Sequence, residues 1–127
     1  MRASGEVVVE RPREAVWRWA TDPEHWHYWQ PETAGPRMRE HEVVSESSAP
    51  RRHVLRSVSG PRFESTLDLF EDVAGTRVRQ TVSAGPNDAL ARFVFVFARP
   101  LARRDMRRQI EAQLARLKEM VELEAAL

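Results

Sequence analysis

The sequence contains no cysteine, which excludes disulfide bonds, thiolate metal sites and a cysteine nucleophile. It has no apolar run near the roughly 18 residues that read as a membrane-spanning helix, and its N-terminal residues lack the apolar segment of a signal peptide. A chain without cysteine suits a reducing compartment, so we expect a cytoplasmic protein. The 20 basic and 19 acidic residues leave a net charge of +1, so charge predicts no general attraction to nucleic acid or to a membrane surface.

Motifs that identify an enzyme by themselves are also absent. The sequence has no Gly-rich phosphate loop, no GxSxG elbow and no HExxH spacing. His25 and His27 lie two residues apart, which directs them to different faces of a helix rather than toward one ion. We therefore expect neither a metal nor an organic cofactor.

What the chain does contain is a series of short strand-like runs. A β-branched run at 5–11 precedes two short helices, which the Asp22-Pro23 break separates and which end before Pro31. Four further β-like runs follow, with short links that predict an antiparallel meander. These four runs cover residues 38–45, 53–58, 63–70 and 76–84.

The C-terminal third carries apolar residues at helical spacing, which would form one stripe along a helix. The members of this stripe are Met106, Ile110, Leu114, Leu117 and Val121. The strand-like middle of the chain is the one available cover for the stripe, and 127 residues fit one domain with one core. We therefore predict a single domain over residues 1–127 with an α+β fold, in which an antiparallel sheet wraps around a long C-terminal helix.

The segment 90–98 (LARFVFVFA) fits two structures. Its phenylalanines alternate with valines, as in a buried strand, but Leu90, Phe93 and Phe97 also fit one face of a helix. That face points nearly opposite to the stripe that begins at Met106, so one straight helix cannot bury both. We favour a helix that is kinked or broken around Pro100 over a strand.

Two segments near the ends of the chain carry recognisable motifs: VVVERPREAVWRWATDPEHWHYWQP at 7–31 and ARPLARRDMRRQIEAQLARLKEMVE at 98–122. They resemble the opening and the closing "Leu-x-x-Leu-Lys-x-x-x-Glu" of the START-like helix-grip (SRPBCC) superfamily, and most of all its polyketide cyclase/dehydrase branch. The matching residues are Pro12, Glu14, Val16, Trp17, Asp22, Pro23, Glu24, Trp29 and Pro31 in the first segment, and Leu114, Leu117, Lys118 and Glu122 in the second.

This resemblance implies a cavity between the sheet and the C-terminal helix. The cavity would bind a hydrophobic, polyketide-like small molecule and promote its cyclisation, aromatisation or dehydration. The family usually has six meander strands, whereas four are found here, and the two expected after Pro31 are missing or compressed into 32–38. The cavity would then be open on that side, and a second copy of the chain would cover it in a homodimer.

Apolar and aromatic residues supply candidate contacts for such a ligand. Trp26, Tyr28 and Trp29 are concentrated in one short helix and fit an aromatic lip at the mouth of the cavity. Trp29 also fits a plug between sheet and helix, and this alternative stays open. The candidate apolar substrate contacts are Trp26, Tyr28, Trp29, Leu67, Phe93 and Phe97.

Four polar residues of the meander are candidates for handling the ligand's oxygens. Ser65 and Gln80 alternate with inward apolar residues, so they face either a ligand or each other. Arg56 would hold a carboxylate, phenolate or polyketide oxygen if its side of the strand is the concave one, as the resemblance implies for pocket arginines, but the pattern leaves that side undecided. The candidate catalytic residues are Arg56, His41 and Ser65, and Gln80 is assigned to substrate binding.

A basic cluster precedes the glutamate-rich end of the last helix. It consists of Arg99, Arg103, Arg104, Arg107 and Arg108. The acidic residues that follow favour a solvated helix face or a subunit contact over binding to nucleic acid or anionic lipid.

Three functions remain open from the sequence. The first is the cyclase or dehydratase described above, which needs two or more polar side chains converging in a cavity. The second is a non-catalytic carrier or sensor, whose cavity would be lined by apolar residues alone. The third is a partner-binding module resembling a co-chaperone, which a filled core would favour.

Overall fold

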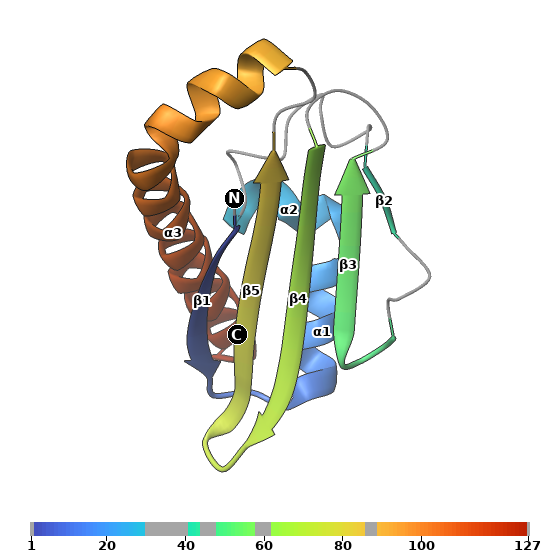
Figure 1. The fold of residues 1–127 in the computed structure, drawn as a ribbon. Coiled ribbons are helices and arrows are strands. Elements are labelled where there is room, and N and C mark those ends of the chain that lie inside the picture. Colours follow the sequence, from blue (N-terminus) through green and yellow to red (C-terminus); the bar gives the residue numbers. More distant parts are fainter. Residues whose placement is uncertain (1, 30–40, 44–47, 58–61, 86–88, 127) are drawn as a thin grey trace.

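A computed structural model describes residues 2–29, 41–43, 48–57, 62–85 and 89–126, with side chains described except at 26–27, 41–43, 57, 62–63, 84–85 and 89–103. The elements follow the predicted order of strand, short helices, meander and long helix (Figure 1). They are β1 (Arg2–Val9), α1 (Arg13–Thr21), the 3₁₀ helix η1 (Pro23–His25), α2 (Trp26–Trp29), β2 (His41–Val43), β3 (Arg52–Ser57), β4 (Arg62–Asp72), β5 (Gly75–Gly85) and α3 (Ala89–Ala126).

The strands form one antiparallel sheet with the order β1-β5-β4-β3-β2. The four later strands are neighbours in the order in which they occur, which confirms the meander, and β1 closes onto the last of them. Short turns suit this arrangement, since antiparallel strands need no crossover. The segment 32–38, where two family strands were expected to be compressed, lies outside the described residues.

The two faces of the sheet differ in chemistry. The outer face carries ion pairs between directly opposed residues of neighbouring strands, with nitrogen–oxygen distances of 2.6 Å for Arg79–Glu6 and 2.7 Å for Arg52–Asp68. The inner face carries the apolar residues of the alternating pattern. Its buried members on β4 and β5 are Ser65, Leu67, Leu69, Thr76, Val78, Gln80 and Val82.

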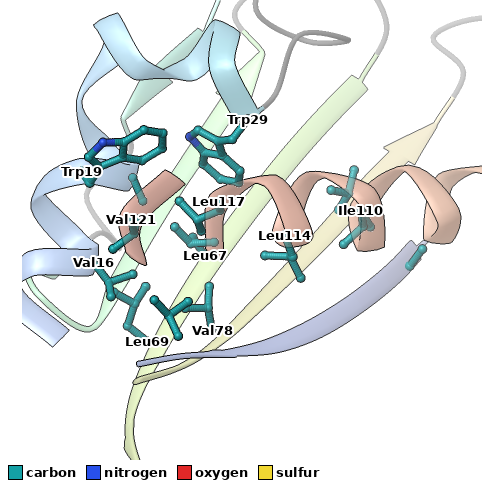
Figure 2. Close-up of a cluster of buried hydrophobic side chains, with 14 residues drawn as sticks. Val16, Trp19, Trp29, Leu67, Leu69, Val78, Ile110, Leu114, Leu117 and Val121 are labelled. Carbon is teal, nitrogen blue, oxygen red and sulfur yellow. The ribbon is translucent and has the colours of Figure 1, made fainter. Parts of the chain in front are cut away.

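The apolar stripe of α3 covers this inner face, as predicted. Ile110, Leu114, Leu117 and Val121 are between 0% and 3% exposed. Together with α1 and α2 they enclose the core between the helices and the sheet (Figure 2). The other labelled core residues in that view are Val16, Trp19, Trp29, Leu67, Leu69 and Val78. The sheet wrapped around the C-terminal helix is therefore confirmed as a helix-grip arrangement of the α+β class.

Polar contacts and one glycine hold α3 close to its neighbours. The Lys118 ammonium donates to the carbonyl oxygen of Val8 at 2.9 Å and pairs with Glu122 at 2.7 Å, which gives these two residues of the closing motif a structural role. On β1, Gly5 faces the helix so closely that a Cβ there would lie 3.1 Å from Cγ2 of Ile110. Since that contact is tighter than ordinary packing, glycine allows the close approach.

Residues 90–98 belong to α3, so the strand alternative for this segment is wrong. Figure 1 shows that the first part of the helix, in orange, turns away from the direction of the remainder. Pro100 lies within α3. Because proline lacks an N–H and crowds the preceding turn, it accounts for a kink inside an unbroken helix. The predicted kinked helix is confirmed.

Truncation of the stripe tests how much the α3 packing contributes to stability. Leu117 is 0% exposed, so Leu117→Ala is expected to lower the free energy of unfolding by about 2–5 kcal/mol through lost burial and a residual cavity. Leu123 lies on the same helix and is 51% exposed. Leu123→Ala is the matched control, and its effect should stay within about 0.5 kcal/mol. Urea unfolding followed by circular dichroism measures both, and equal effects would contradict the packing described.

Candidate functional site

Two buried polar side chains meet on the inner face of the sheet, among apolar neighbours. Gln80 is 2% exposed and Ser65 is 8% exposed. The Gln80 Nε2 group donates to the Ser65 hydroxyl oxygen at 3.4 Å, a long hydrogen bond. The side-chain oxygen of Gln80 is buried and has no hydrogen-bond partner among the described residues.

A small, partly open space lies between the short helices and strands β3 to β5, and this pair helps to line it. Its volume is about 10 Å³, which is room for about one water-sized group. We name its lining the polar pocket. It comprises Ala20, Trp29, His53, Leu55, Ser65, Leu67 and Gln80.

Trp29 contributes a second unsatisfied group to the polar pocket. This residue is 2% exposed and belongs to the core cluster, yet within the described part of the chain nothing accepts a hydrogen bond from its buried indole Nε1–H. Its backbone is fixed from the other side, because Arg116 on α3 donates to its carbonyl oxygen at 3.3 Å. Two residues of the pocket lining thus carry a buried polar group without a partner among the described residues, a donor on Trp29 and an acceptor on Gln80.

His53 supplies a titratable group at the edge of the same pocket. Its ring packs edge-on against Trp17 of α1, with 5.7 Å between the ring centroids. Burial lowers the pKa of His53 below its ordinary value, because the protonated imidazole is poorly solvated there. The neutral ring is thus favoured near neutral pH, and in that form one ring nitrogen is a donor and the other an acceptor.

The structure brings four of the predicted site residues together. Trp29, Leu67, Ser65 and Gln80 come from α2, β4 and β5 and all line the polar pocket. The predicted parity of β4 and β5 is therefore correct, whereas the roles assigned to these side chains remain predictions.

Arg56 lies elsewhere: the side of its strand, which the sequence left undecided, is the outer one, so the condition for its predicted oxygen-binding role is not met. It is opposite Glu64 in the β3–β4 register, and its guanidinium pairs with that carboxylate at 3.3 Å on the exposed outer face. The inner face of β3 instead carries His53 and Leu55. A guanidinium among apolar side chains would need a buried counter-charge, whereas outside it is solvated and paired.

The aromatic lip is not formed as predicted by the residues whose side chains are described. Tyr28 is 52% exposed, while Trp29 points into the core and fits the plug alternative. The side chains of Trp26, His41, Phe93 and Phe97 lie outside the described residues. The backbone of His41 pairs with that of Ser57 at the β2 edge of the sheet.

Three pocket residues were not selected from the sequence, namely Ala20, Leu55 and His53, and His53 is the titratable one among them. The pattern on β3 is apolar on both sides, since Val54 and Leu55 are both buried, with 4% and 6% exposure. Alternation therefore could not say which side faces inward. The cross-strand register settles the question in the structure, because it pairs Arg56 with Glu64 on the outer face and so places His53 inside.

Metal ligands, membrane-spanning helices and the basic cluster can also be assessed in the described part of the chain. The residues described there contain no group of three His, Asp or Glu side chains that could hold a metal ion. In that same part, no helix is long and apolar enough to cross a membrane. Of the basic cluster, Arg104, Arg107 and Arg108 are exposed, and Arg107 pairs with Glu111 one turn on at 3.3 Å. These contacts fit the solvated helix face.

The pKa of His53 makes stability depend on pH in a definite direction. The unfolded chain takes up a proton near the ordinary histidine pKa of about 6.5, while folded His53 takes it up at lower pH. The free energy of unfolding should therefore fall as pH drops below about 6.5. In His53→Phe this part of the decrease is absent, so the variant should gain stability relative to the natural chain between about pH 7.5 and 5.5. Urea midpoints at both pH values check this, and parallel changes in the two proteins would contradict it.

Comparison with known proteins finds likeness in the fold. The sequence matches no protein-family model and no curated protein. Among solved structures it is similar to TTHA0849 from Thermus thermophilus, with 22% identity over 100% of both chains and a TM-score of 0.62. It is also similar to SA2116, a protein of unknown function from Staphylococcus aureus, with 11% identity over 100% of this chain and 96% of that one and a TM-score of 0.72.

An AHSA1-like protein from Aeromonas hydrophila is similar as well, with 17% identity over 98% of this chain and 94% of that one and a TM-score of 0.65. All three likenesses combine nearly complete coverage with low sequence identity. They establish a fold in common with these proteins, and they carry no activity over to this chain.

Proposed function

We propose that the polar pocket is the inner end of a binding site for an apolar small molecule that carries a hydroxyl or carbonyl oxygen. One observation supports this most directly. The indole N–H of Trp29 and the side-chain oxygen of Gln80 are both buried in the pocket lining without a partner among the described residues. Burying such groups unpaired costs about 1–3 kcal/mol each, so an oxygen-bearing group that satisfies them is bound favourably.

The size and chemistry of the pocket define which part of a ligand it accepts. A hydroxyl group can accept from the Trp29 N–H and donate to the Gln80 oxygen, and a water molecule can do the same in the absence of ligand. The volume of about 10 Å³ admits one such group and no ring. The pocket would therefore fix one oxygen of the ligand, and the apolar body of the ligand would extend away from it.

Such a site would select ligands by their oxygen rather than by shape alone. A binding site whose buried polar groups are satisfied by a ligand hydroxyl discriminates against the analogue that lacks it, because the groups are then left unpaired. A carrier whose site is lined by apolar groups alone gains its affinity from the apolar area that it buries, so it would bind both analogues about equally. Selectivity for the hydroxyl is thus the property that distinguishes this proposal from a purely apolar carrier.

A second candidate is the cyclisation or dehydration of a polyketide-like ligand, and the position of His53 favours it. A neutral imidazole beside Gln80 and Ser65 is a base that functions near neutral pH. In this hypothesis His53 takes a proton from the carbon next to a ligand carbonyl, and Gln80 Nε2 donates to that carbonyl oxygen. The imidazolium then returns the proton to a leaving hydroxyl, which departs as water. Ser65 keeps its predicted place in the proton relay, and His41 and a homodimer remain predictions.

Paired ligands test the binding proposal. We expect 2-naphthol to bind more tightly than naphthalene by roughly 3- to 10-fold, the value of one added hydrogen bond. The indole N–H resonance of Trp29, identified by its loss in Trp29→Phe, should shift with 2-naphthol and not with naphthalene in ¹H–¹⁵N spectra. Gln80→Leu should remove the preference for the hydroxyl.

Control variants separate binding from folding. Gln109 is exposed on α3, so Gln109→Leu should keep the preference of the natural chain. The double variant Ser65→Ala/Gln80→Leu replaces both polar partners and should stay within about 1 kcal/mol of the original stability. Equal affinity for the two ligands in the natural chain would overturn the proposal.

A further inference from the structure

An open groove lies at the end of the sheet where β4 continues past the start of β3. Its volume is about 760 Å³, and it shares no lining residue with the polar pocket. Four of its lining side chains are arginines, brought together from α1, the turn before β3, β3 itself and β5. We name this feature the arginine groove and define it by Arg13, Arg51, Arg52 and Arg77.

The charges in the arginine groove do not balance. Two carboxylates line it: Glu71 pairs with Arg13 at 3.4 Å, and Asp68 pairs with Arg52 at 2.7 Å. Four guanidinium groups against two carboxylates leave two positive charges (4 − 2 = 2). This excess is local, because the whole chain has a net charge of only +1.

The two remaining arginines have no carboxylate partner in the described part of the chain. Arg77 lies over the ring of Phe70, with 4.9 Å from the guanidinium carbon to the ring centroid, and this contact holds the group in place without neutralising it. Arg51 also lines the groove, and it is exposed. A positioned cation and an accessible one thus face the same space.

Two hydrogen-bond donors of the groove residues also lack acceptors among the described residues. The Nε–H groups of Arg13 and Arg77 are buried, and no described atom accepts a hydrogen bond from either of them. Buried donors in folded proteins are nearly always paired. An acceptor-rich anion would supply what both groups lack.

We propose that the arginine groove binds a phosphate monoester group. The planar guanidinium fork matches the oxygens of phosphate in a bidentate manner. A phosphate monoester carries about −1.5 to −2 charges near neutral pH, which neutralises most or all of the excess of two positive charges, whereas a single carboxylate would neutralise half of it. The groove is separate from the polar pocket, so this inference is independent of the apolar-ligand proposal.

Titration with inorganic phosphate tests the site directly. The Nε–H resonances of Arg13 and Arg77 should shift and saturate as phosphate is added at constant ionic strength, while chloride should leave them unchanged. Arg51→Gln and Arg77→Gln should each weaken binding roughly tenfold, as expected for a charge-assisted hydrogen bond. Arg51 is exposed, so Arg51→Gln is expected to fold. It therefore still tests the site if Arg77→Gln fails to fold.

Arg56→Gln is the matched control, because Arg56 is an exposed arginine of the same sheet that pairs with Glu64 outside the groove. It should retain the phosphate affinity of the natural chain. Absence of a saturable shift, or an equal loss in Arg56→Gln, would overturn the proposal.

The source of the phosphate is distinguished by two further ligands. Binding of glycerol 3-phosphate in solution would assign the groove to a small phosphorylated molecule. Binding only to vesicles of phosphatidylcholine with phosphatidic acid, and not to phosphatidylcholine alone, would assign it to a lipid headgroup. Either result supports a phosphate monoester site, and binding to neither overturns it.

Discussion

The packing of one apolar stripe of α3 against the inner face of the sheet is the constraint on which the other features depend. A strand has side chains on alternate sides, so a shift of one residue would turn its whole apolar set to solvent. Burial of Leu114 and Leu117 against the sheet fixes which side of each strand faces inward. The positions of His53 inside and Arg56 outside follow from this one choice.

The order of the elements, the antiparallel meander and the stripe of α3 could be predicted from the sequence, because periodic patterns of apolar residues indicate them. The kink of α3 could be predicted because the helix contains a proline. The sequence was also sufficient for the polar residues of β4 and β5, where apolar and polar positions alternate clearly. It failed on β3, where Val54 and Leu55 are both buried and alternation gives no answer. There the decisive information was the cross-strand pairing with Glu64, which depends on register and not on local sequence.

The two proposed sites differ in charge: the polar pocket is lined by neutral groups, and the arginine groove is lined by cations. Inside, the pocket offers neutral donors and acceptors from Trp29, Gln80 and His53, because an unpaired charge would be costly among apolar side chains. The arginine groove is open and holds four cations, of which Arg13 and Arg52 pair with carboxylates. The two sites share no lining residue, so we treat them as separate.

The contact between Lys118 and Val8 has a consequence for association between copies of the chain. β1 is an edge strand, and edge strands expose backbone groups that can pair with a strand from another molecule. Here an ammonium group already occupies the carbonyl oxygen of Val8, and α3 lies along the strand. An incoming strand would have to displace both, so this edge is protected from sheet extension and from the aggregation that begins that way.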